Sequence, residues 1–194
     1  MSNQTIKTTL LETGLHLLLE KGYNHTGIQE VLQTVGVPKG SFYHYFASKQ
    51  EFGLAVLDHY VQRHDTTLGR FLVETNVKPL LRLRRYFEAC RDHFAALGYR
   101  EGCLVGMLSE ELADQNETFR LQLEAILTKW SECWTQCLRE AQQDGELPSH
   151  FDPSLLAQFC LNTWEGTLLR MKVSKSSAPI DTFMTLLFGS ILKT

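Results

Sequence analysis

The chain has 194 residues, 43% of them apolar, and its 19 basic and 22 acidic residues nearly balance. This length allows one domain or two small ones, and the charge balance excludes a protein that binds nucleic acid through a large overall positive charge. The five cysteines form no pattern of paired disulfides, so we expect their thiols to be reduced. The first residues lack a signal-peptide pattern, and every apolar stretch is too short for a membrane span. We therefore expect a cytoplasmic protein with no membrane partner.

Apolar residues recur at intervals of three or four from the N-terminus onward, which predicts helices. A first helix is expected to end at Gly22. Thr26 and Gln29 have the spacing of a capping box, so a second helix is expected to begin there and to end at Gly36. Pro38 suits the first turn of a third helix, where its missing N–H group costs nothing.

Farther along, Ser48 and Glu51 form another capping-box pattern that opens a fourth helix, expected over about 48–72. Residues 73–79 have the composition of a junction. No strand pattern, repeat or low-complexity tract follows, so the predicted fold is all-α with about nine helices. The other five helices are expected over 79–97, from Cys103 onward, and over about 116–143, 153–174 and 179–193.

Residues 26–52 combine a short capped helix, a glycine turn and a second short helix rich in aromatic and small polar residues. This pattern is typical of a helix-turn-helix, whose second helix can lie in the major groove of DNA. A helix that begins at Pro38 would present Lys39, Gly40 and Ser41 at its N-terminal end, where free N–H groups favour phosphate. Hydrogen-bond donors beyond that turn would come from Tyr43 and His44.

The segment GVPKGSFYHYFASKQEF closely resembles the helix-turn-helix signature of TetR-family transcriptional regulators. The resemblance implies a DNA-binding domain over 1–50, and an effector-sensing and dimerisation domain over 51–194 that the fourth helix joins to it. It implies base or base-edge contacts from Lys39, Gly40, Ser41 and His44. It implies phosphate contacts from Thr26, Tyr43, Tyr45 and Lys49.

Some residues of this segment also have a purely structural interpretation. Phe42 and Phe46 stand four apart and are expected in the core of the small domain, where one of the tyrosines can join them. Thr26 is first of all a helix cap. Lys49 would place a cation in the first turn of the fourth helix, which is unfavourable unless a phosphate occupies the spot.

The last two helices carry wide apolar faces. In TetR-like proteins this pair meets its symmetry mate in a four-helix bundle, which implies a homodimer. A two-fold dimer reads two half-sites, so the double-stranded operator is expected to be roughly palindromic. The alternative is that both faces belong wholly to the core of one chain. In the helix after residue 79, Arg82, Arg84 and Arg85 are expected to form a solvated face, not a nucleic-acid patch.

The cysteines divide into two groups. Cys133 and Cys137 stand four apart on an apolar helix face without a third ligand, so we expect core packing and neither a metal site nor a cofactor. Cys103 stands at a helix start, where free N–H groups stabilise a thiolate. The residues alone leave core packing and sensing both open for Cys103.

The segments GCLVGMLSEEL and GTLLRMKVSKS resemble those of a TetR branch that includes the NemR-type repressors, which respond to reactive electrophiles such as quinones, aldehydes and maleimides. The resemblance implies that Cys103 is a sensing thiol and that Lys172 is its partner. Lys172 can equally be part of an ordinary basic helix end. The branch also contains members that bind small unsaturated acids without thiol chemistry.

The sequence therefore predicts a homodimeric transcriptional repressor, not an enzyme, that a small-molecule effector releases from its operator. Non-covalent control by a small organic ligand is the first alternative. A thiol-dependent enzyme is less favoured, because no resolving cysteine pattern or catalytic base motif stands out. A DNA-binding protein without any effector is the remaining alternative.

Overall fold

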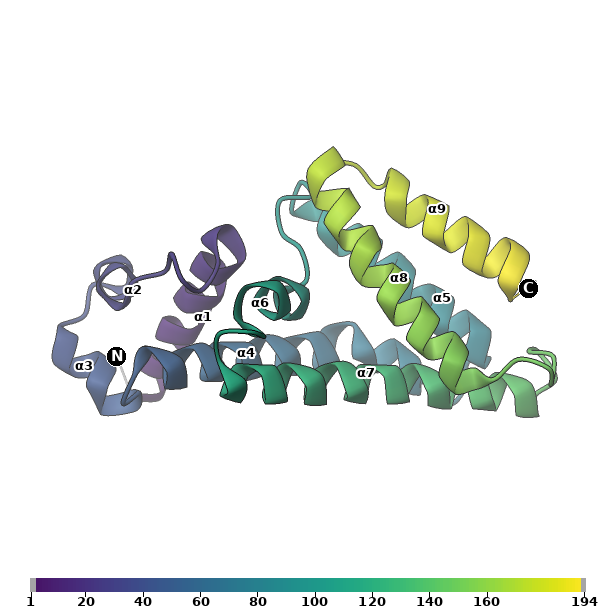
Figure 1. Cartoon of the computed structure of the whole chain (residues 1–194), viewed down its shortest axis with the longest axis horizontal. Helices are drawn as coiled ribbons and strands as arrows, with labels where there is room; N and C mark the ends of the chain where they lie inside the picture. Colours follow the sequence, from purple (N-terminus) through teal and green to yellow (C-terminus); the bar gives the residue numbers. More distant parts are fainter. Residues whose placement is uncertain (1–2, 193–194) are drawn as a thin grey trace. The chain divides into compact units, whose positions relative to one another are not determined.

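The computed structural model describes the backbone of residues 3–192 and the side chains of residues 5–192. The described residues form nine α-helices and no strand, which confirms the all-α prediction (Figure 1). Residue 193, the expected end of the last helix, lies outside this range. The helices are α1 (Asn3–Lys21), α2 (Ile28–Val35), α3 (Lys39–Tyr45), α4 (Lys49–Thr67), α5 (Pro79–Ala96), α6 (Leu104–Leu112), α7 (Glu117–Gln143), α8 (Pro153–Ser174) and α9 (Ala178–Leu186).

The fourth and ninth helices end earlier than the sequence predicts. After α4, a short 3-10 helix covers Gly69–Val73, and after α9 a π-helical turn covers Leu187–Ile191. Within the described part of the chain, no helix is both long and apolar enough to cross a membrane.

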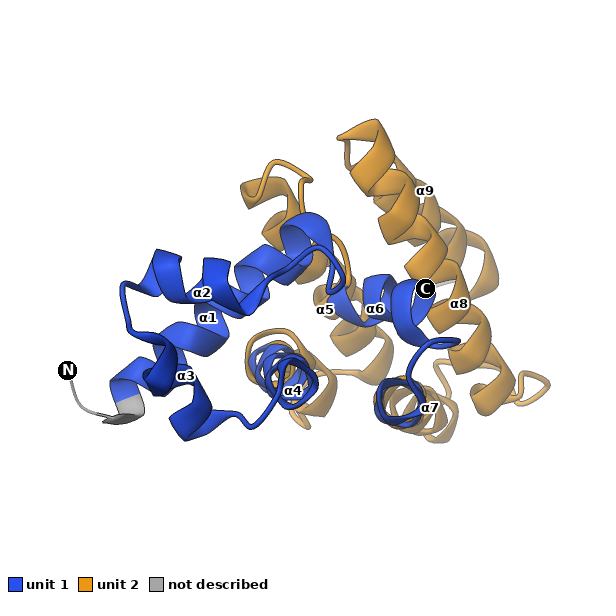
Figure 2. Ribbon diagram, turned by 60° about the vertical axis from the view of Figure 1, so that its left-hand side comes forward, with its two compact units in different colours: residues 1–63, 104–123 blue, residues 64–103, 124–194 orange. Residues whose placement is uncertain are grey.

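The chain divides into two compact units (Figure 2). Unit 1 comprises Met1–Arg63 and Leu104–Leu123, and unit 2 comprises His64–Cys103 and Glu124–Thr194. Unit 1 extends beyond the expected DNA-binding domain of residues 1–50, because α6 packs on α1. The Glu111 carboxylate of α6 accepts hydrogen bonds from the N–H groups of Tyr23 (2.7 Å) and Asn24 (2.6 Å).

The core of unit 1 brings α1 and α4 into close contact. A Cβ atom on Gly14 would lie 2.4 Å from Cζ of Phe52, so only glycine allows this approach. The ring of Tyr23 meets that of Phe119 edge-on at 5.1 Å. Side chains buried in this core include Leu10, Leu18, Val31, Leu32, Phe42, Phe46, Phe52, Val56 and Leu57 from the N-terminal segment and Leu104, Val105, Leu108, Leu112, Phe119 and Leu123 from the second segment.

Two glycines and one capping box bound the helices of unit 1 as predicted. Gly22 (φ +82°) and Gly36 (φ +74°) adopt the left-handed conformation that ends α1 and α2. At the start of α4 the Glu51 N–H group donates to Ser48 Oγ (3.1 Å), and the Glu51 carboxylate accepts from the Ala47 N–H group (2.7 Å).

The capping box predicted at Thr26 is wrong. Helix α2 begins after Gly27, and no side chain caps it. Thr26 is buried, and its hydroxyl instead donates to the carbonyl oxygen of Gly22 at 2.7 Å. The threonine therefore closes the turn between α1 and α2 in place of capping α2.

Unit 2 has an aromatic core centred on Phe87 of α5. Its ring lies 4.8 Å from that of Trp164, 5.0 Å from that of Phe183 and 5.2 Å from that of Trp134. Such edge-on and tilted pairs add stability beyond the area that they bury. Helices α5, α7, α8 and α9 thus share one core.

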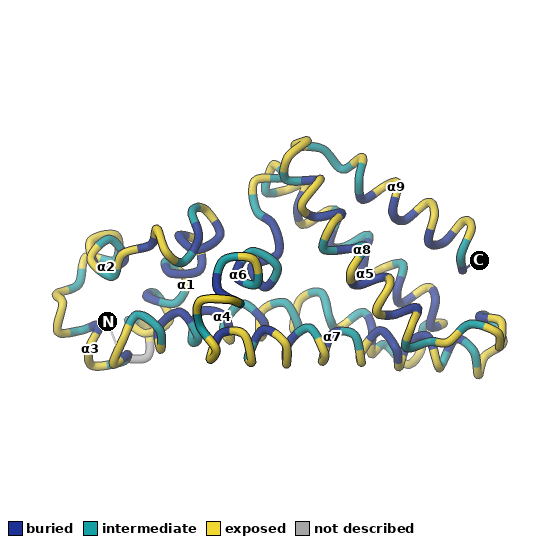
Figure 3. Tube along the Cα trace, in the orientation of Figure 1, coloured by how far each residue is buried: buried dark blue, intermediate teal, exposed yellow. Residues whose placement is uncertain are grey.

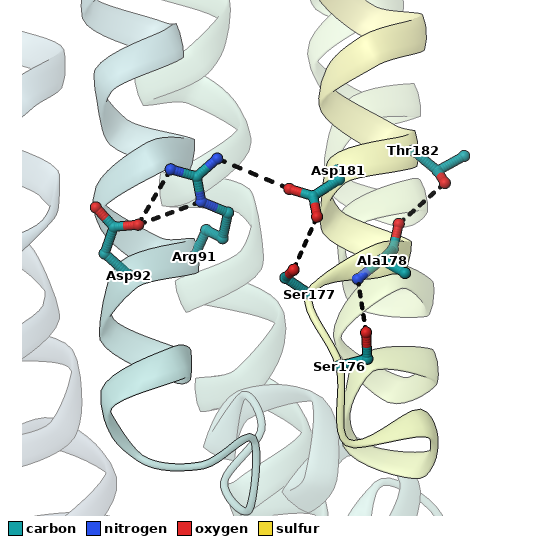
Figure 4. A network of polar contacts seen from close by, with 7 residues as sticks. All are labelled: Arg91, Asp92, Ser176, Ser177, Ala178, Asp181 and Thr182. Carbon is teal, nitrogen blue, oxygen red and sulfur yellow. Dashed lines mark hydrogen bonds and ion pairs between the residues drawn. The ribbon is translucent and has the colours of Figure 1, made fainter.

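A polar network links α5 to the start of α9 (Figure 4). The Arg91 guanidinium lies 3.2 Å from Oδ1 of Asp92 and 3.7 Å from Oδ1 of Asp181. The Ser177 hydroxyl donates to Oδ2 of Asp181 at 2.8 Å. An acidic side chain in the first turn of a helix is favoured by the helix dipole, so Asp181 both opens α9 and ties it to α5.

The predicted solvated face of three arginines is wrong in one position. Arg82 is only 5% exposed, donates to the Leu72 carbonyl at 3.1 Å and pairs with Glu140 of α7. Arg84 lies over the ring of Phe188, at 4.4 Å. Arg85 is exposed, as expected. The burial of Arg82 depends on a carboxylate distant in the sequence, which helical spacing does not reveal.

Candidate DNA-binding and sensing sites

Helix α3 is fixed in unit 1 by two buried aromatic residues. Phe42 is 0% exposed and Phe46 2%, which confirms their expected place in the core. Their rings lie 5.2 Å and 5.0 Å from that of Phe52 on α4. Because these two rings face inward, the opposite side of α3 faces outward.

The outward side of α3 carries the residues that the resemblance assigns to DNA. Lys39, Gly40 and His44 are exposed, and the Tyr43 side chain is 50% exposed. Lys39 Nζ lies 5.8 Å from the centre of the Tyr43 ring. A Cβ atom on Gly40 would meet nothing within 4 Å, so packing inside the chain does not require glycine there. A glycine on this surface leaves room for another molecule to approach the backbone.

Helix α3 begins one residue later than predicted. Pro38 is the residue before its first turn, and the Ser41 N–H group donates to the Pro38 carbonyl at 2.9 Å. Ser41 and Tyr45 are half-buried, and the Tyr45 ring contacts that of His44 at 4.8 Å.

Two of the predicted phosphate contacts are already engaged inside unit 1. Thr26 is 2% exposed, so its hydroxyl is not available to a phosphate in this conformation. Lys49 Nζ lies 4.5 Å from the centre of the Tyr23 ring and 3.5 Å from the carbonyl oxygen of Asn24. Burial lowers the pKa of Lys49, and the nearby Glu111 carboxylate opposes that shift. These partners account for a cation at the start of α4 without a phosphate.

Cys103 and Lys172, the predicted sensing pair, both contribute to one region of unit 2. The sequence predicts Cys103 in the first turn of its helix, but α6 begins one residue later, at Leu104, so Cys103 immediately precedes it. The Cys103 side chain is 6% exposed. A Cβ atom on the adjacent Gly102 would lie 3.6 Å from Cδ of Lys172 on α8. The lysine stem therefore runs past the residue next to the thiol.

Sequence reasoning missed the third member of this region, Glu165. It lies on α8, is half-buried and is hydrogen-bonded to the Cys103 side chain. Burial raises the pKa of the Glu165 carboxyl, and the hydrogen bond from Cys103 opposes this. Glu165 and Lys172 are seven residues apart, on one face of α8. The sequence signal that could have indicated Glu165 is its position as an acidic residue directly after Trp164, which is buried.

The other thiols differ in their exposure. Cys137 is 1% exposed, and its thiol donates to the Pro79 carbonyl at 3.1 Å. Burial raises the pKa of Cys90, Cys137 and Cys160 to about 12, so these thiols are inert at neutral pH.

The prediction that Cys133 packs in the core is wrong. Its side chain is exposed, because it lies at the edge of the stripe that Trp130, Trp134 and Cys137 form on α7. Partial desolvation raises the pKa of Cys133, with a further contribution from Asp65. Among the described residues, no group of three or more His, Cys, Asp or Glu side chains is placed to hold a metal ion.

The wide apolar face predicted for α8 has two sides (Figure 3). The inner side packs in the core through Leu156, Cys160, Trp164, Leu168 and Met171. The outer side leaves large apolar side chains in the open, with exposures of 52–72% for Leu155, Phe159, Leu169 and Val173. On α9, Leu186 is 55% exposed.

Comparison with known proteins identifies related chains. Residues 10–56 match the family model of bacterial regulatory proteins of the tetR family, and residues 79–187 match that of the tetracyclin repressor-like C-terminal domain. The transcriptional regulator AcuR of Cereibacter sphaeroides is 39% identical over 93% of this chain and 82% of AcuR. The transcriptional repressor DhaR of Mycobacterium sp. is 33% identical over 99% of this chain and 95% of DhaR. The crystal structure of reduced E. coli NemR matches with a TM-score of 0.84 and 29% identity, over 95% of this chain and 96% of that chain.

Proposed function

The chain belongs to the TetR family of bacterial regulatory proteins, and on that basis we propose that it is a DNA-binding repressor that a small-molecule signal releases from its operator. As a member of this family it is a transcriptional regulator and not an enzyme. The observation that carries the proposal is the outward side of α3, which a pair of buried phenylalanines holds in place. Because its target is chromosomal DNA, the repressor acts in the cytoplasm.

In the proposed complex, α3 lies in the major groove. The exposed ends of Lys39 and His44 support direct contacts to base edges, and Gly40 and Ser41 allow the backbone to come close. Backbone phosphates are contacted by Tyr43, Tyr45 and Lys49, although Lys49 must leave the Tyr23 ring to do so. Thr26 is omitted from this set because it is buried.

A second copy of the chain is the proposed occupant of the outer side of α8 and α9. Leu155 and Phe159 stand four residues apart, as do Leu169 and Val173, and helical periodicity places all four on one face of α8, as a helix–helix interface requires. Gly166 lies among them, and a Cβ atom there would meet nothing within 4 Å. Glycine inside a helix costs about 1 kcal/mol relative to alanine, and close approach of a partner helix offers a reason for it. A two-fold dimer would read a roughly palindromic operator.

For the signal, we favour covalent modification of Cys103 by a small electrophile or oxidant, with Lys172 as its neighbour. The lysine stem beside Gly102 supports this pairing, and the likeness to a NemR crystallised in a reduced form supports thiol chemistry. Because Cys103 is 6% exposed, the reagent must be small enough to enter the fold.

Non-covalent binding of a small organic ligand is the second candidate. It is favoured by Trp130, whose indole Nε1 is buried without a hydrogen-bond partner among the described residues. The Trp130 ring lies 4.6 Å from that of His64, which in turn bonds to the Tyr86 hydroxyl at 3.0 Å. A ligand with an acceptor atom would satisfy the indole N–H group.

Either signal must favour the released conformation over the DNA-bound one. Helix α4 begins directly after the DNA-binding segment and continues into unit 2. A change in unit 2 that displaces α4 would alter the spacing of the two α3 helices in the dimer and weaken operator binding.

A gel-shift titration with DNA from upstream of the protein's own gene tests the proposal. N-ethylmaleimide is expected to weaken operator binding of the wild type by roughly 5- to 150-fold, a usual range for allosteric coupling. Cys103→Ser is expected to stay bound under the same treatment, whereas Cys133→Ser, which removes the exposed thiol, responds like the wild type. Lys39→Ala is expected to bind poorly without any reagent. Equal release of Cys103→Ser and the wild type would refute covalent sensing and leave the ligand-controlled repressor.

A further inference from the structure

The turn between α1 and α2 binds a carboxylate of its own chain. The N–H groups of Tyr23 and Asn24 donate to the two carboxylate oxygens of Glu111, at 2.7 and 2.6 Å. Gly22 makes room for this carboxylate, because a Cβ atom there would lie 2.7 Å from Oε2 of Glu111. Glu111 lies on α6, which belongs to the same compact unit as α1, α2 and the start of α4 (Figure 2). Successive backbone N–H groups at a turn form an anion-binding concavity, and here Glu111 fills it.

Lys49, in the first turn of α4, lies against the same two turn residues. Its Nζ atom is 4.5 Å from the centre of the Tyr23 ring and 3.5 Å from the carbonyl oxygen of Asn24. Gly53, one helical turn after Lys49, lets the ring approach α4, because a Cβ atom there would lie 2.6 Å from Cε2 of Tyr23. The Phe119 ring meets that of Tyr23 edge-on at 5.1 Å. The aromatic ring that carries the ammonium group is therefore fixed by packing.

We propose that Glu111 stands in for a DNA phosphate: its carboxylate holds the Lys49 ammonium group at the turn, so that DNA must compete with Glu111 for this lysine. The inference rests on the proposed function, in which Lys49 leaves the Tyr23 ring to contact a phosphate. The chain then binds DNA more weakly than it would with a free Lys49. Because phosphate contacts carry no sequence information, Glu111 acts on the affinity for all DNA and not on the choice of operator.

The charges and hydrogen bonds of the turn support this competition. The N–H group of Asn24 donates to Glu111 and its carbonyl oxygen accepts from Lys49, so one residue joins the anion to the cation. Burial lowers the pKa of Lys49, and the Glu111 carboxylate opposes that shift, as an attraction between the two charges requires. Lys49 is half-buried, so solvent screens this attraction only in part. Without the Glu111 charge, the Tyr23 ring and a hydrogen bond of 3.5 Å would hold Lys49 less firmly.

Glu111→Gln tests the competition, because it removes the charge and keeps the size of the side chain. Its affinity for a duplex from upstream of the protein's own gene, measured by fluorescence anisotropy, is expected to rise by roughly 2- to 5-fold for each Lys49 released. The gain should be the same on a scrambled duplex of equal length. Glu110→Gln is the matched control, since it removes an exposed carboxylate of α6 with the same change in net charge, and it should bind like the wild type.

A double-mutant cycle with Lys49→Met separates this competition from a merely structural role of Glu111. In the Lys49→Met background, Glu111→Gln is expected to leave the affinity unchanged, because no ammonium group remains to be released. A second measurement needs no DNA: NMR titration of the Lys49 ε-CH2 group should give a lower pKa in Glu111→Gln, since the carboxylate that raises this pKa is gone. Weaker or unchanged DNA binding of Glu111→Gln, or an equal gain in the Lys49→Met background, would overturn the proposal.

Further variants keep the proposal and the proposed function apart. If circular dichroism shows that Glu111→Gln does not fold, Tyr23→Leu replaces it, because it removes the ring beside Lys49 and must likewise tighten DNA binding. If Lys49→Met lowers the affinity neither in the wild type nor in Glu111→Gln, Lys49 contacts no phosphate and the proposal fails, while operator binding through α3, tested by Lys39→Ala, stands. A wild type that does not bind the upstream duplex at all would refute the proposed function itself.

Discussion

Polar side chains join α4, α5 and α7 inside unit 2. Asp65 accepts from Lys129 Nζ at 2.6 Å and lies 3.3 Å from Nδ1 of His64. The other ring nitrogen of His64 lies 3.0 Å from the Tyr86 hydroxyl. The hydrogen bond from His64 and the ion pair with Lys129 lower the pKa of Asp65 from 3.8 to about 2.

We expect Asp65→Asn to destabilise the protein at neutral pH and much less in acid. A carboxyl whose pKa is lowered in the folded state stabilises that state above its unfolded pKa, and this contribution fades as pH falls from about 4 towards 2. Because the Asp65 side chain is 34% exposed, solvent screening reduces the expected cost to about 1 kcal/mol at pH 7.

Urea unfolding of the wild type and Asp65→Asn at pH 7 and pH 3 measures this difference. About half of it is expected to be lost at pH 3, midway between the two pKa values. The exposed Asp114→Asn is the matched control and should behave like the wild type at both pH values. A difference that does not change with pH would show that packing, and not charge, is the cause.

At the scale of helices, the ends of the elements follow local chemistry. Gly22, Gly36 and Gly145 all adopt left-handed conformations at φ +82°, +74° and +73°, and each follows a helix that the sequence predicts to stop there. Asp152 caps α8 by accepting from the N–H groups of Ser154 and Leu155, at 2.8 and 3.2 Å. These signals are readable because they act within a few residues.

The cap at Ser48 has particular weight because α4 directly follows α3, the helix that we propose to enter the major groove. Ser48→Ala is expected to lower the free energy of unfolding by about 1 kcal/mol, since it removes the acceptor for the Glu51 N–H group. Guanidinium unfolding measures the change, and hydrogen exchange should show faster exchange of amides in the first turn of α4. Ser149→Ala, in an exposed loop, is the control and should be neutral. An unaltered stability of Ser48→Ala would mean that water replaces the cap at no cost.

In the molecule as a whole, the exposed apolar side chains on the outer side of α8 have no packing partner within a single chain's core. Four large apolar side chains on one helix are more than half exposed, and the inner side of the same helix fills the core of unit 2. Large exposed apolar patches on soluble proteins mark sites of interaction with another protein, a membrane or a ligand. The proposed pairing with a second copy would bury the same patch on both chains.

We expect Phe159→Glu combined with Leu169→Glu to dissociate the proposed dimer. Loss of a buried interface anchor costs about 2 kcal/mol, so the dimer dissociation constant should rise by roughly 30-fold or more. Sedimentation velocity at micromolar concentration measures this, and operator affinity should fall with it. The control Leu121→Glu replaces a leucine of α7 that is 55% exposed and should remain dimeric. A double variant that stays dimeric would place the interface elsewhere.

Helix positions, helix ends and the family can be predicted from the sequence. Helix periodicity, turn glycines and caps depend on residues that are only a few positions apart, and the helix-turn-helix signature is a continuous segment. These features can therefore be recognised from the order of residues without the three-dimensional structure. The four-residue spacing of Phe42 and Phe46 predicts their place in the core, and their burial confirms it. Residues 153–174 were predicted as a helix, and α8 spans Pro153–Ser174.

Which side chains meet across the fold is visible only in three dimensions. Arg82 is buried because Glu140, 58 residues away, pairs with it, and Thr26 is buried because the turn at Gly22 accepts its hydroxyl. Cys133 is exposed because it lies at the edge of the apolar stripe of α7. Glu165 meets Cys103 only because α8 folds against the segment before α6. Burial and charge at such sites depend on partners distant along the chain, and one-dimensional spacing does not contain them.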